Sequence, residues 1–268
     1  MSIQLDGIKE TLLLPLWGRA FETKKKNPFL VDMKALEIIE NIDYDFSSFE
    51  KCINPLSRAS WIARSIYFDN KIRQFLEAYP EASIINIGCG LDTTYDRINN
   101  NRAKWYEIDF PEVIEIRKNY VAECSNRIFL PCSVLDNSWY VKIENKKDVF
   151  LMMAGVIYYF DESQVSNLFQ SISDGFKKCD IAFDYSSPRG VKIANKQVIE
   201  RGGMDKEAYL RWGIKNIHEL EKWNPKIKIV ENVKMFDNYK KRFPVKKRIG
   251  MVISDMLSIM SLAHVRIE

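Results

Sequence analysis

The chain is poor in the residues that most often build metal sites and acid–base sites. Its 268 residues include only two histidines, His218 and His264, and five cysteines that form no C-x-x-C pair. Neither histidine has a second type of ligand at metal-binding spacing, so we expect no structural or catalytic zinc and no other metal. Isolated cysteines without a secretory segment predict reduced thiols in a soluble, cytoplasmic protein.

Long apolar runs and long runs of one charge are also missing. The stretch Leu12–Trp17 is far too short to span a bilayer and has no basic segment before it, so we expect no membrane partner. The basic runs Lys24–Lys26, Lys240–Arg242 and Lys246–Arg248 are short, and the formal net charge is only +4. We interpret them as solvated faces and predict no nucleic-acid partner. A weakly positive field would still attract an anionic small molecule. No feature of the sequence sets an oligomeric state.

Neither an internal repeat nor a low-complexity linker divides the chain, and its length suits one large domain. We therefore predict a single domain in four parts. Residues 1–80 form an N-terminal helical region, 81–186 a ligand-binding core, 187–225 a cap insertion and 226–268 the C-terminal edge of a sheet.

Short β-rich runs alternate with helical patterns after residue 80. The expected strands are Ser83–Gly88, Lys104–Ile108, Arg127–Pro131, Asp148–Met153 and Asp180–Tyr185, and the expected helices among them are Pro111–Ala122 and Glu162–Phe176. Runs that are apolar nearly throughout suit strands covered on both faces. The alternation predicts an α/β fold with a doubly wound, mostly parallel sheet.

The alternation stops after Ser186. We expect a cap over the carboxyl edge of the sheet, with a hinge at Gly202-Gly203. We predict that its amphipathic helix runs through Tyr209, Trp212, Ile217 and Leu220. The alternative is an extra packing helix that contacts no ligand. The remaining segments, Lys226–Lys234, a helix near Arg248–Ile259, and Leu262–Ile267, predict a late antiparallel pair of strands at the sheet edge.

A glycine pair follows the first expected strand. Gly88 and Gly90 allow a sharp turn and a close approach of ligand to backbone, and Asp109, at the end of the next strand, can accept two hydrogen bonds from ribose hydroxyls. A dinucleotide motif would place a third glycine where this chain has Thr93, so that the helix N-terminus meets a pyrophosphate. S-adenosylmethionine (SAM) has no pyrophosphate. The pattern therefore favours SAM over NAD(P).

Several stretches together carry a family resemblance. They are Arg58…Ala63-Arg64, the run from Ile87 to Thr94 and the run from Tyr106 to Pro111, with Arg19-Ala20…Asp32 and Gly155–Tyr159 added in the bacterial branch. In these stretches the sequence resembles the leucine carboxyl methyltransferase family, and in particular its bacterial relatives of the tetracenomycin-type polyketide O-methyltransferases. The resemblance implies a Rossmann-like class I SAM-dependent methyltransferase.

The resemblance also implies cofactor contacts. Arg64 would pair with the methionyl carboxylate of SAM, Gly88, Cys89 and Gly90 would lie under the cofactor, and Asp109 would hold its ribose. Four further expected positions are Ser133, Val134, Ala154 and Gly155. Two of these depart from the family: Ser133-Val134 stands where an acidic residue and leucine are usual, and Ala154 stands where the protein-methylating branch has glutamate. These changes would either weaken SAM binding or mark a different branch.

The expected reaction is O-methylation of a carboxylate or hydroxyl on a small, acidic acceptor. A carboxylate is already ionised at neutral pH and needs no base, whereas a hydroxyl needs one. His218 and Tyr158 are the candidates for catalysis, and Arg19, Tyr158 and Trp212 are the candidates for acceptor binding. The alternatives are a binding module of the same fold without turnover and an NAD(P)-dependent oxidoreductase.

Overall fold

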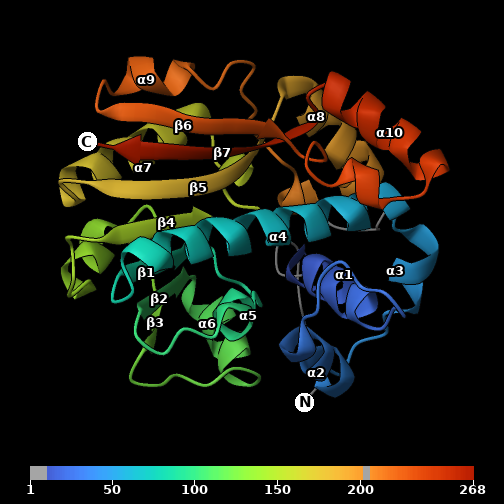
Figure 1. Cartoon of the computed structure of the whole chain (residues 1–268), viewed down its shortest axis with the longest axis horizontal. Helices are drawn as coiled ribbons and strands as arrows, with labels where there is room; N and C mark the ends of the chain where they lie inside the picture. The colour runs from blue at the N-terminus through green and yellow to red at the C-terminus, as the bar shows by residue number, and fades with distance from the viewer. Residues whose placement is uncertain (1–10, 202–205) are drawn as a thin grey trace.

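The computed structural model describes residues 11–201 and 206–268. A seven-stranded sheet in the order β3-β2-β1-β4-β5-β7-β6 forms its centre (Figure 1). The strands are β1 (Ser83–Ile87), β2 (Lys104–Asp109), β3 (Arg127–Pro131), β4 (Val149–Met153), β5 (Cys179–Ser186), β6 (Ile227–Lys234) and β7 (Met260–Ile267). β1 to β5 pair in parallel, and β7 lies antiparallel between β5 and β6. The predicted α/β fold with a late antiparallel pair is confirmed.

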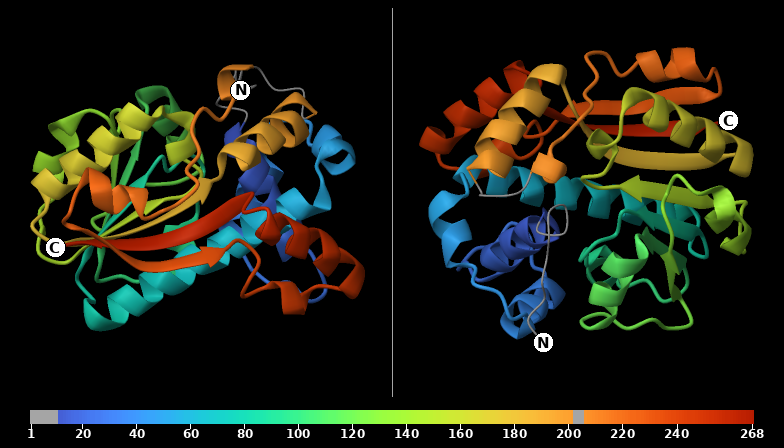
Figure 2. Two further views of the ribbon diagram at one scale, coloured as in Figure 1. Left: turned by 90° about the horizontal axis from the view of Figure 1, so that it is seen from above. Right: turned by 180° about the vertical axis from the view of Figure 1, so that it is seen from behind.

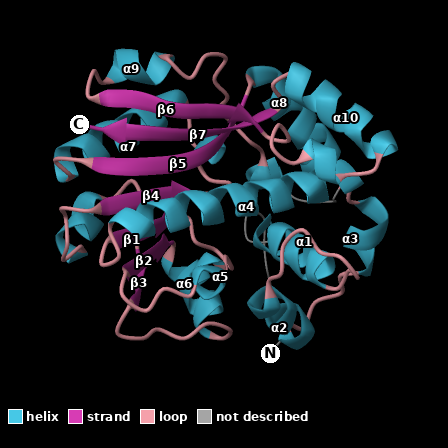
Figure 3. Cartoon of the chain, in the orientation of Figure 1, coloured by secondary structure: helices cyan, strands magenta, loops and turns pink. Residues whose placement is uncertain are grey.

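Helices cover both faces of this sheet (Figure 3). They are α1 (Leu13–Thr23), α2 (Met33–Asn41), α3 (Ser47–Cys52), α4 (Pro55–Ala78), α5 (Thr94–Ile98), α6 (Pro111–Lys118), α7 (Glu162–Gly175), α8 (Pro188–Ala194), α9 (Glu219–Trp223) and α10 (Val245–Met256). The long helix α4 crosses one face, and the view from behind in Figure 2 shows α7 on the other. None of the helices in the described part of the chain is long and apolar enough to cross a membrane.

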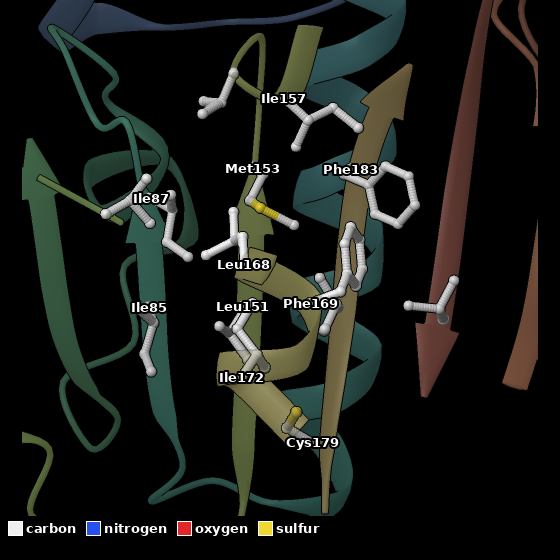
Figure 4. Close-up of a cluster of buried hydrophobic side chains, with 14 of the residues drawn as sticks. Ile85, Ile87, Leu151, Met153, Ile157, Leu168, Phe169, Ile172, Cys179 and Phe183 are labelled. Atoms are coloured by element: carbon white, nitrogen blue, oxygen red, sulfur yellow. The ribbon is translucent and has the colours of Figure 1, made fainter. Parts of the chain in front are cut away.

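The central strands bury side chains on both faces, because α4 and α7 pack on opposite sides. Phe150 and Met152 of β4 lie with Phe68 and Ile72 of α4 in one apolar cluster. Their neighbours on β4 point the other way: Figure 4 shows Leu151 and Met153 beside Leu168, Phe169 and Ile172 of α7. All five residues of β4 are fully buried. This explains why the strand reads as a continuous apolar run rather than as an alternating one.

The first helices pack beside the carboxyl ends of the strands. α1 buries Leu13, Leu14 and Leu16 in a third apolar cluster, which also contains Cys89 and Leu91 of the loop after β1. The structure thus places α1 against the glycine-containing loop that the sequence singled out. Ile199, from the segment 187–225 that the sequence predicts to be a cap, belongs to the same cluster.

The predicted amphipathic helix through Tyr209, Trp212, Ile217 and Leu220 is wrong. Between the short helical turn at residues 206–208 and α9 the backbone is irregular, and its amide groups bond to other segments. Arg211 N and Trp212 N donate to Tyr158 O, and Ile214 N donates to Ser186 O. These tertiary hydrogen bonds replace the i to i−4 bonds that a helix would need.

The helices of the cap lie earlier in the segment. They are α8 and a π-helical turn, Asn195–Glu200. The proposed hinge at Gly202-Gly203 lies outside the described residues. α10 begins three residues before the predicted Arg248 and ends at Met256.

Candidate active site

A cavity of about 270 Å³ lies beyond the carboxyl ends of β1 and β4. These two strands are neighbours in the sheet, and the chain winds from β1 toward β3 on one side and from β4 toward β5 on the other. The cavity therefore lies at the topological switch point, where doubly wound folds bind their ligands. Walls come from residues of α1, α4, α8, the π-helical turn, and the ends of α10 and β7.

The loop after β1 forms a floor without side chains. Gly88 has a φ of +63°, and a Cβ at this position would lie 2.5 Å from Val156 Cγ2. Gly90 has a φ of +43°, and its Cβ would lie 2.7 Å from Leu12 Cδ2. Both positions therefore require glycine for backbone conformation and for space. Gly88, Cys89 and Gly90 all line the cavity.

Asp109 supports this floor from the end of β2. Its Oδ2 accepts a hydrogen bond from Gly90 N at 2.7 Å, and its Oδ1 accepts one from Phe110 N at 2.8 Å. Each carboxylate oxygen keeps a lone pair for a further donor. Burial raises the pKa of Asp109, although these two hydrogen bonds oppose the shift. The residue lies behind Gly90 and is not itself part of the cavity lining.

Arg64 projects from α4 into the cavity, where only 10% of its side chain is exposed. Its Nη1 donates to Asp184 Oδ2 at 2.9 Å and to Tyr158 Oη at 3.2 Å. Burial alone would lower the pKa of Arg64, but Asp184 and Tyr158 raise it, so the guanidinium stays charged. Within the described residues the hydrogen bonds of Arg64 use Nη1 alone, which leaves two nitrogens, Nη2 and Nε, with three N–H bonds for an anion.

Asp184 is the site residue that the sequence reasoning missed. It is fully buried near the end of β5, and its Oδ1 accepts a hydrogen bond from Gly155 N at 2.6 Å while Oδ2 holds Arg64. One carboxylate thus fixes both the arginine and the loop after β4. One sequence feature could have pointed to Asp184: it is an acidic residue within the otherwise apolar end of the expected strand Asp180–Tyr185.

Tyr158 and Tyr159 both line the cavity. Burial raises the pKa of each phenol, so both are protonated at neutral pH and can donate hydrogen bonds. The Tyr158 hydroxyl accepts from Arg64 Nη1 and donates to Asp184 Oδ2 at 3.4 Å, so it is a hydrogen-bond donor at neutral pH and not a base. Ala154 and Gly155 also line the cavity, as the sequence predicts.

Arg19 lines the cavity, but its hydrogen bonds go to the protein. Nε pairs with Asp32 Oδ2 at 2.8 Å, and Nη2 donates to Leu91 O at 3.2 Å. Nε and Nη2 are thus occupied by Asp32 and the loop after β1, and a contact of Arg19 with an acceptor stays a prediction.

Four other predicted residues lie outside the cavity lining. Trp212 is buried in the main apolar cluster and packs against Trp223. His218 precedes α9 with 60% of its side chain exposed, and its Nδ1 lies 2.8 Å from Glu221 Oε2. Ser133 is half-buried and Val134 is buried after β3. The structure therefore brings neither His218 nor Trp212 to the site.

The part of the cavity away from the glycine loop is lined mainly by uncharged side chains. They include Trp61, Phe68, Met235, Phe236 and Met260, together with Ser57, Ser60 and Ser254. These residues come from α4, α10 and the ends of β6 and β7, which are far apart in the sequence. Sequence patterns gave no sign that they meet.

Few ionisable side chains line the cavity in the described part of the chain. Besides the two tyrosines and Cys89 they are Arg19, Arg64 and Asp92. Burial alone would raise the pKa of Asp92, but Arg97 and Arg19 lower it to about 2. Burial raises the pKa of the Cys89 thiol. No lining group in these residues is therefore poised to take a proton at neutral pH. No group of three or more His, Cys, Asp or Glu side chains in the same residues is arranged to hold a metal ion.

Comparison with known proteins identifies relatives of this chain. The family model described as leucine carboxyl methyltransferase matches residues 13–173. The tetracenomycin polyketide synthesis O-methyltransferase TcmP of Streptomyces glaucescens is 27% identical over 253 residues, which cover 93% of this chain and 92% of that protein. The S-adenosyl-L-methionine-dependent methyltransferase dpfgK of Gibberella zeae is 24% identical and covers 89% of this chain and 86% of its own length.

A solved structure agrees in fold. The plantazolicin methyltransferase BamL, crystallised with a triazolic desmethylPZN analog and S-adenosylhomocysteine, superimposes with a TM-score of 0.51 at 11% identity. The match covers 97% of both chains. At this identity the likeness supports the architecture of the sheet and its helices and no finer statement.

Proposed function

The chain belongs to the leucine carboxyl methyltransferase family of SAM-dependent enzymes, and we propose that it methylates the carboxylate of a small molecule with a largely apolar body. One observation carries the choice of a carboxylate. The cavity lining in the described residues has no group that can remove a proton from a hydroxyl at neutral pH. A carboxylate, with an ordinary pKa near 4, needs no such group.

The cavity fits the cofactor of this family. The Nη2 and Nε groups of Arg64 would bind the methionyl carboxylate, because a guanidinium matches a carboxylate with two parallel hydrogen bonds. The backbone of Gly88, Cys89 and Gly90, which lines the cavity, would lie against the cofactor. The free lone pairs of Asp109 would accept the ribose hydroxyls beside Gly90. Family membership argues against the NAD(P)-linked alternative.

When bound, SAM would supply an electrophilic methyl group: an acceptor oxygen would bond to the methyl carbon in line as the bond from that carbon to sulfur breaks, and S-adenosylhomocysteine would leave. The residues of this chain then have to align the acceptor rather than activate it. The Tyr158 hydroxyl, which donates to Asp184 Oδ2 over a long 3.4 Å, would turn its proton to one acceptor oxygen and leave the other oxygen free to react. Alignment of this kind can lower a barrier by roughly 7–11 kcal/mol.

The uncharged walls suggest what the rest of the acceptor is like. Trp61, Phe68 and Phe236 present rings to the cavity, and the nearby serines offer neutral hydrogen bonds. Such a lining suits an acceptor whose body is flat or apolar. It offers no positive charge to pair with a second anionic group of the acceptor far from Arg64. One relative, TcmP, is named for polyketide synthesis, and a polyketide would be such an acceptor.

The test uses purified protein, SAM carrying a labelled methyl group, and acceptors in matched pairs. Each aromatic carboxylic acid is paired with the phenol of the same ring system. We expect label to enter the acids as methyl esters, which alkali hydrolyses, and Arg64→Ala to abolish SAM binding in calorimetry. Label in alkali-stable ethers of the phenols would overturn the carboxylate proposal. SAM binding without transfer to any acceptor would favour the binding-module alternative.

A further inference from the structure

Thr93 stands where a dinucleotide motif would have its third glycine, and its side chain makes specific contacts. The residue is fully buried between the loop after β1 and α5. Its Oγ1 donates to Asp32 Oδ2 at 2.6 Å and accepts from Arg97 Nη1 at 2.9 Å. The direction follows from chemistry, because a carboxylate can only accept and a guanidinium can only donate.

Asp32 connects several segments through one carboxylate. It is fully buried at the start of α2, where Oδ1 caps the helix by accepting from Ala35 N at 2.9 Å. Oδ2 accepts from Thr93, from Arg19 Nε at 2.8 Å and from Arg97 Nη1 at 2.7 Å. Asp32 therefore joins α2, α1 and the segment that follows the glycine loop.

The contact with Arg19 fixes α1 over the glycine loop. Nη2 of the same arginine donates to Leu91 O, between Gly90 and Asp92. At the start of α1, Leu12 packs so closely on Gly90 that no Cβ would fit between them. Leu12, Leu14 and Pro15 form part of the cavity wall. The position of this wall thus depends on the Arg19–Asp32 pair.

The contact with Arg97 reaches the helix that carries Arg64. Arg97 binds Asp69 of α4 with two hydrogen bonds, Nε to Oδ2 at 3.0 Å and Nη2 to Oδ1 at 2.9 Å. Asp69 lies five residues beyond Arg64 on the same helix. Thr93, Asp32 and Arg97 hence tie the glycine loop to both α1 and α4, and none of the three lines the cavity.

We propose that Thr93 and Asp32 are positioning residues. They hold α1 and the Arg64-bearing helix α4 in a fixed position relative to the glycine loop, which contains Gly88 and Gly90. The expected fall in kcat rests on the proposed methyl transfer, whereas the expected loss of SAM affinity does not. Loss of the Thr93 hydroxyl removes a donor from Asp32 and an acceptor from Arg97 without adding bulk. The glycine loop then loses its side-chain link to Asp32 and to Arg97 Nη1, whereas the ion pairs of Asp32 with Arg19 and Arg97 and the apolar packing of α1 remain.

The test compares Thr93→Val, which has nearly the same shape without the hydroxyl, with Thr93→Ser, which keeps the hydroxyl. We expect Thr93→Val to weaken SAM binding at least tenfold in calorimetry, to lower kcat against any acceptor found, and to speed amide hydrogen exchange in residues 13–23. Thr93→Ser should stay within about threefold of the parent in each measurement.

A purely structural role gives a different pattern. Thr93→Val would then lower the melting temperature but leave the SAM Kd and the exchange of α1 unchanged well below that temperature, and the proposal would be overturned. Should Thr93→Val not fold, Asp32→Asn takes its place in the same measurements. The expected outcome and the outcome that would overturn the proposal are then the ones given for Thr93→Val. If the parent binds SAM but methylates nothing, the proposed function fails while the Kd and exchange comparisons still decide this inference.

Discussion

Asp184 of β5 holds Arg64 of α4 by a 2.9 Å contact between Oδ2 and Nη1, across 120 residues of sequence. The pair is almost completely buried, with side-chain exposures of 0% and 10%. Because Asp184 occupies only Nη1, the remaining edge of the guanidinium faces the cavity. The carboxylate thus sets both the charge and the orientation of the group that we expect to bind the cofactor.

Substitution of Asp184 by asparagine should weaken SAM binding. Both oxygens of Asp184 accept hydrogen bonds, so an amide in either orientation would point its NH2 group at Gly155 N or at Arg64. A lost charged hydrogen bond is worth about 1.5–3 kcal/mol, which corresponds to roughly tenfold to hundredfold in Kd. Calorimetric titration with SAM measures the change.

The matched control is Asp180→Asn at the opposite end of β5. Asp180 pairs with His264 and Arg266, away from the cavity. We expect this variant to lose stability but to keep its affinity for SAM. Equal losses of affinity in the two variants would mean that Asp184 acts only through the stability of the strand.

SAM affinity should fall as the pH falls below neutrality. Burial raises the pKa of Asp109, so this carboxyl takes up a proton at a higher pH than an exposed aspartate. Hydroxyl donors of a bound ribose favour the ionised form, and protonation therefore competes with binding. Titrations at pH 6.5, 5.5 and 4.5 should show progressively weaker binding by the parent and a weaker but flatter profile for Asp109→Asn. A parallel pH profile in both proteins would assign the effect to another group.

Alanine should be tolerated at one helical glycine and not at the loop glycine Gly88. At Gly88 the positive φ costs about 1–2 kcal/mol and overlap with Val156 adds about 1–3 kcal/mol, so Gly88→Ala should lower the free energy of unfolding by about 2–5 kcal/mol. At Gly250 in α10 the nearest atom to a new Cβ is 3.9 Å away, and Gly250→Ala should raise stability by about 0.5–1 kcal/mol. Urea unfolding compares the two. Similar destabilisation at both positions would contradict the steric argument.

Removal of the exposed histidine should leave catalysis unchanged. His218 lies outside the cavity and contacts Glu221 in the next turn. We expect His218→Ala to retain kcat/KM within about twofold at pH 6 to 8. A loss of tenfold or more in kcat/KM would identify it as the base and would favour a hydroxyl acceptor.

Local signals in the sequence predicted the sheet and its glycine loop. The strands β1 to β5 are bounded by turns and are apolar nearly throughout, so their existence and approximate ends follow from pattern alone. Gly88, Gly90 and Asp109 are also local features, since each stands at a fixed place relative to a strand end. These positions needed no knowledge of how distant segments meet.

The rest of the site depends on tertiary contacts that no local pattern encodes. Asp184 becomes significant only because α4 brings Arg64 to it. The segment from Tyr209 to Leu220 shows apolar residues at helical spacing, yet its amides bond to Tyr158 and Ser186, and Trp212 is buried without a helix. Arg19 is similarly paired with Asp32, which lies 13 residues further along the chain at the start of α2.

The order of the strands has a consequence for synthesis of the chain. β7 follows β6 along the chain, but it lies between β5 and β6 in the sheet, and Arg266 pairs across from both Asp180 and Lys228. β6 therefore has no partner in the sheet until β7 has been synthesised. We expect β5 and β6 to expose unpaired backbone edges until β7 inserts between them, and this makes the folding intermediate prone to aggregation.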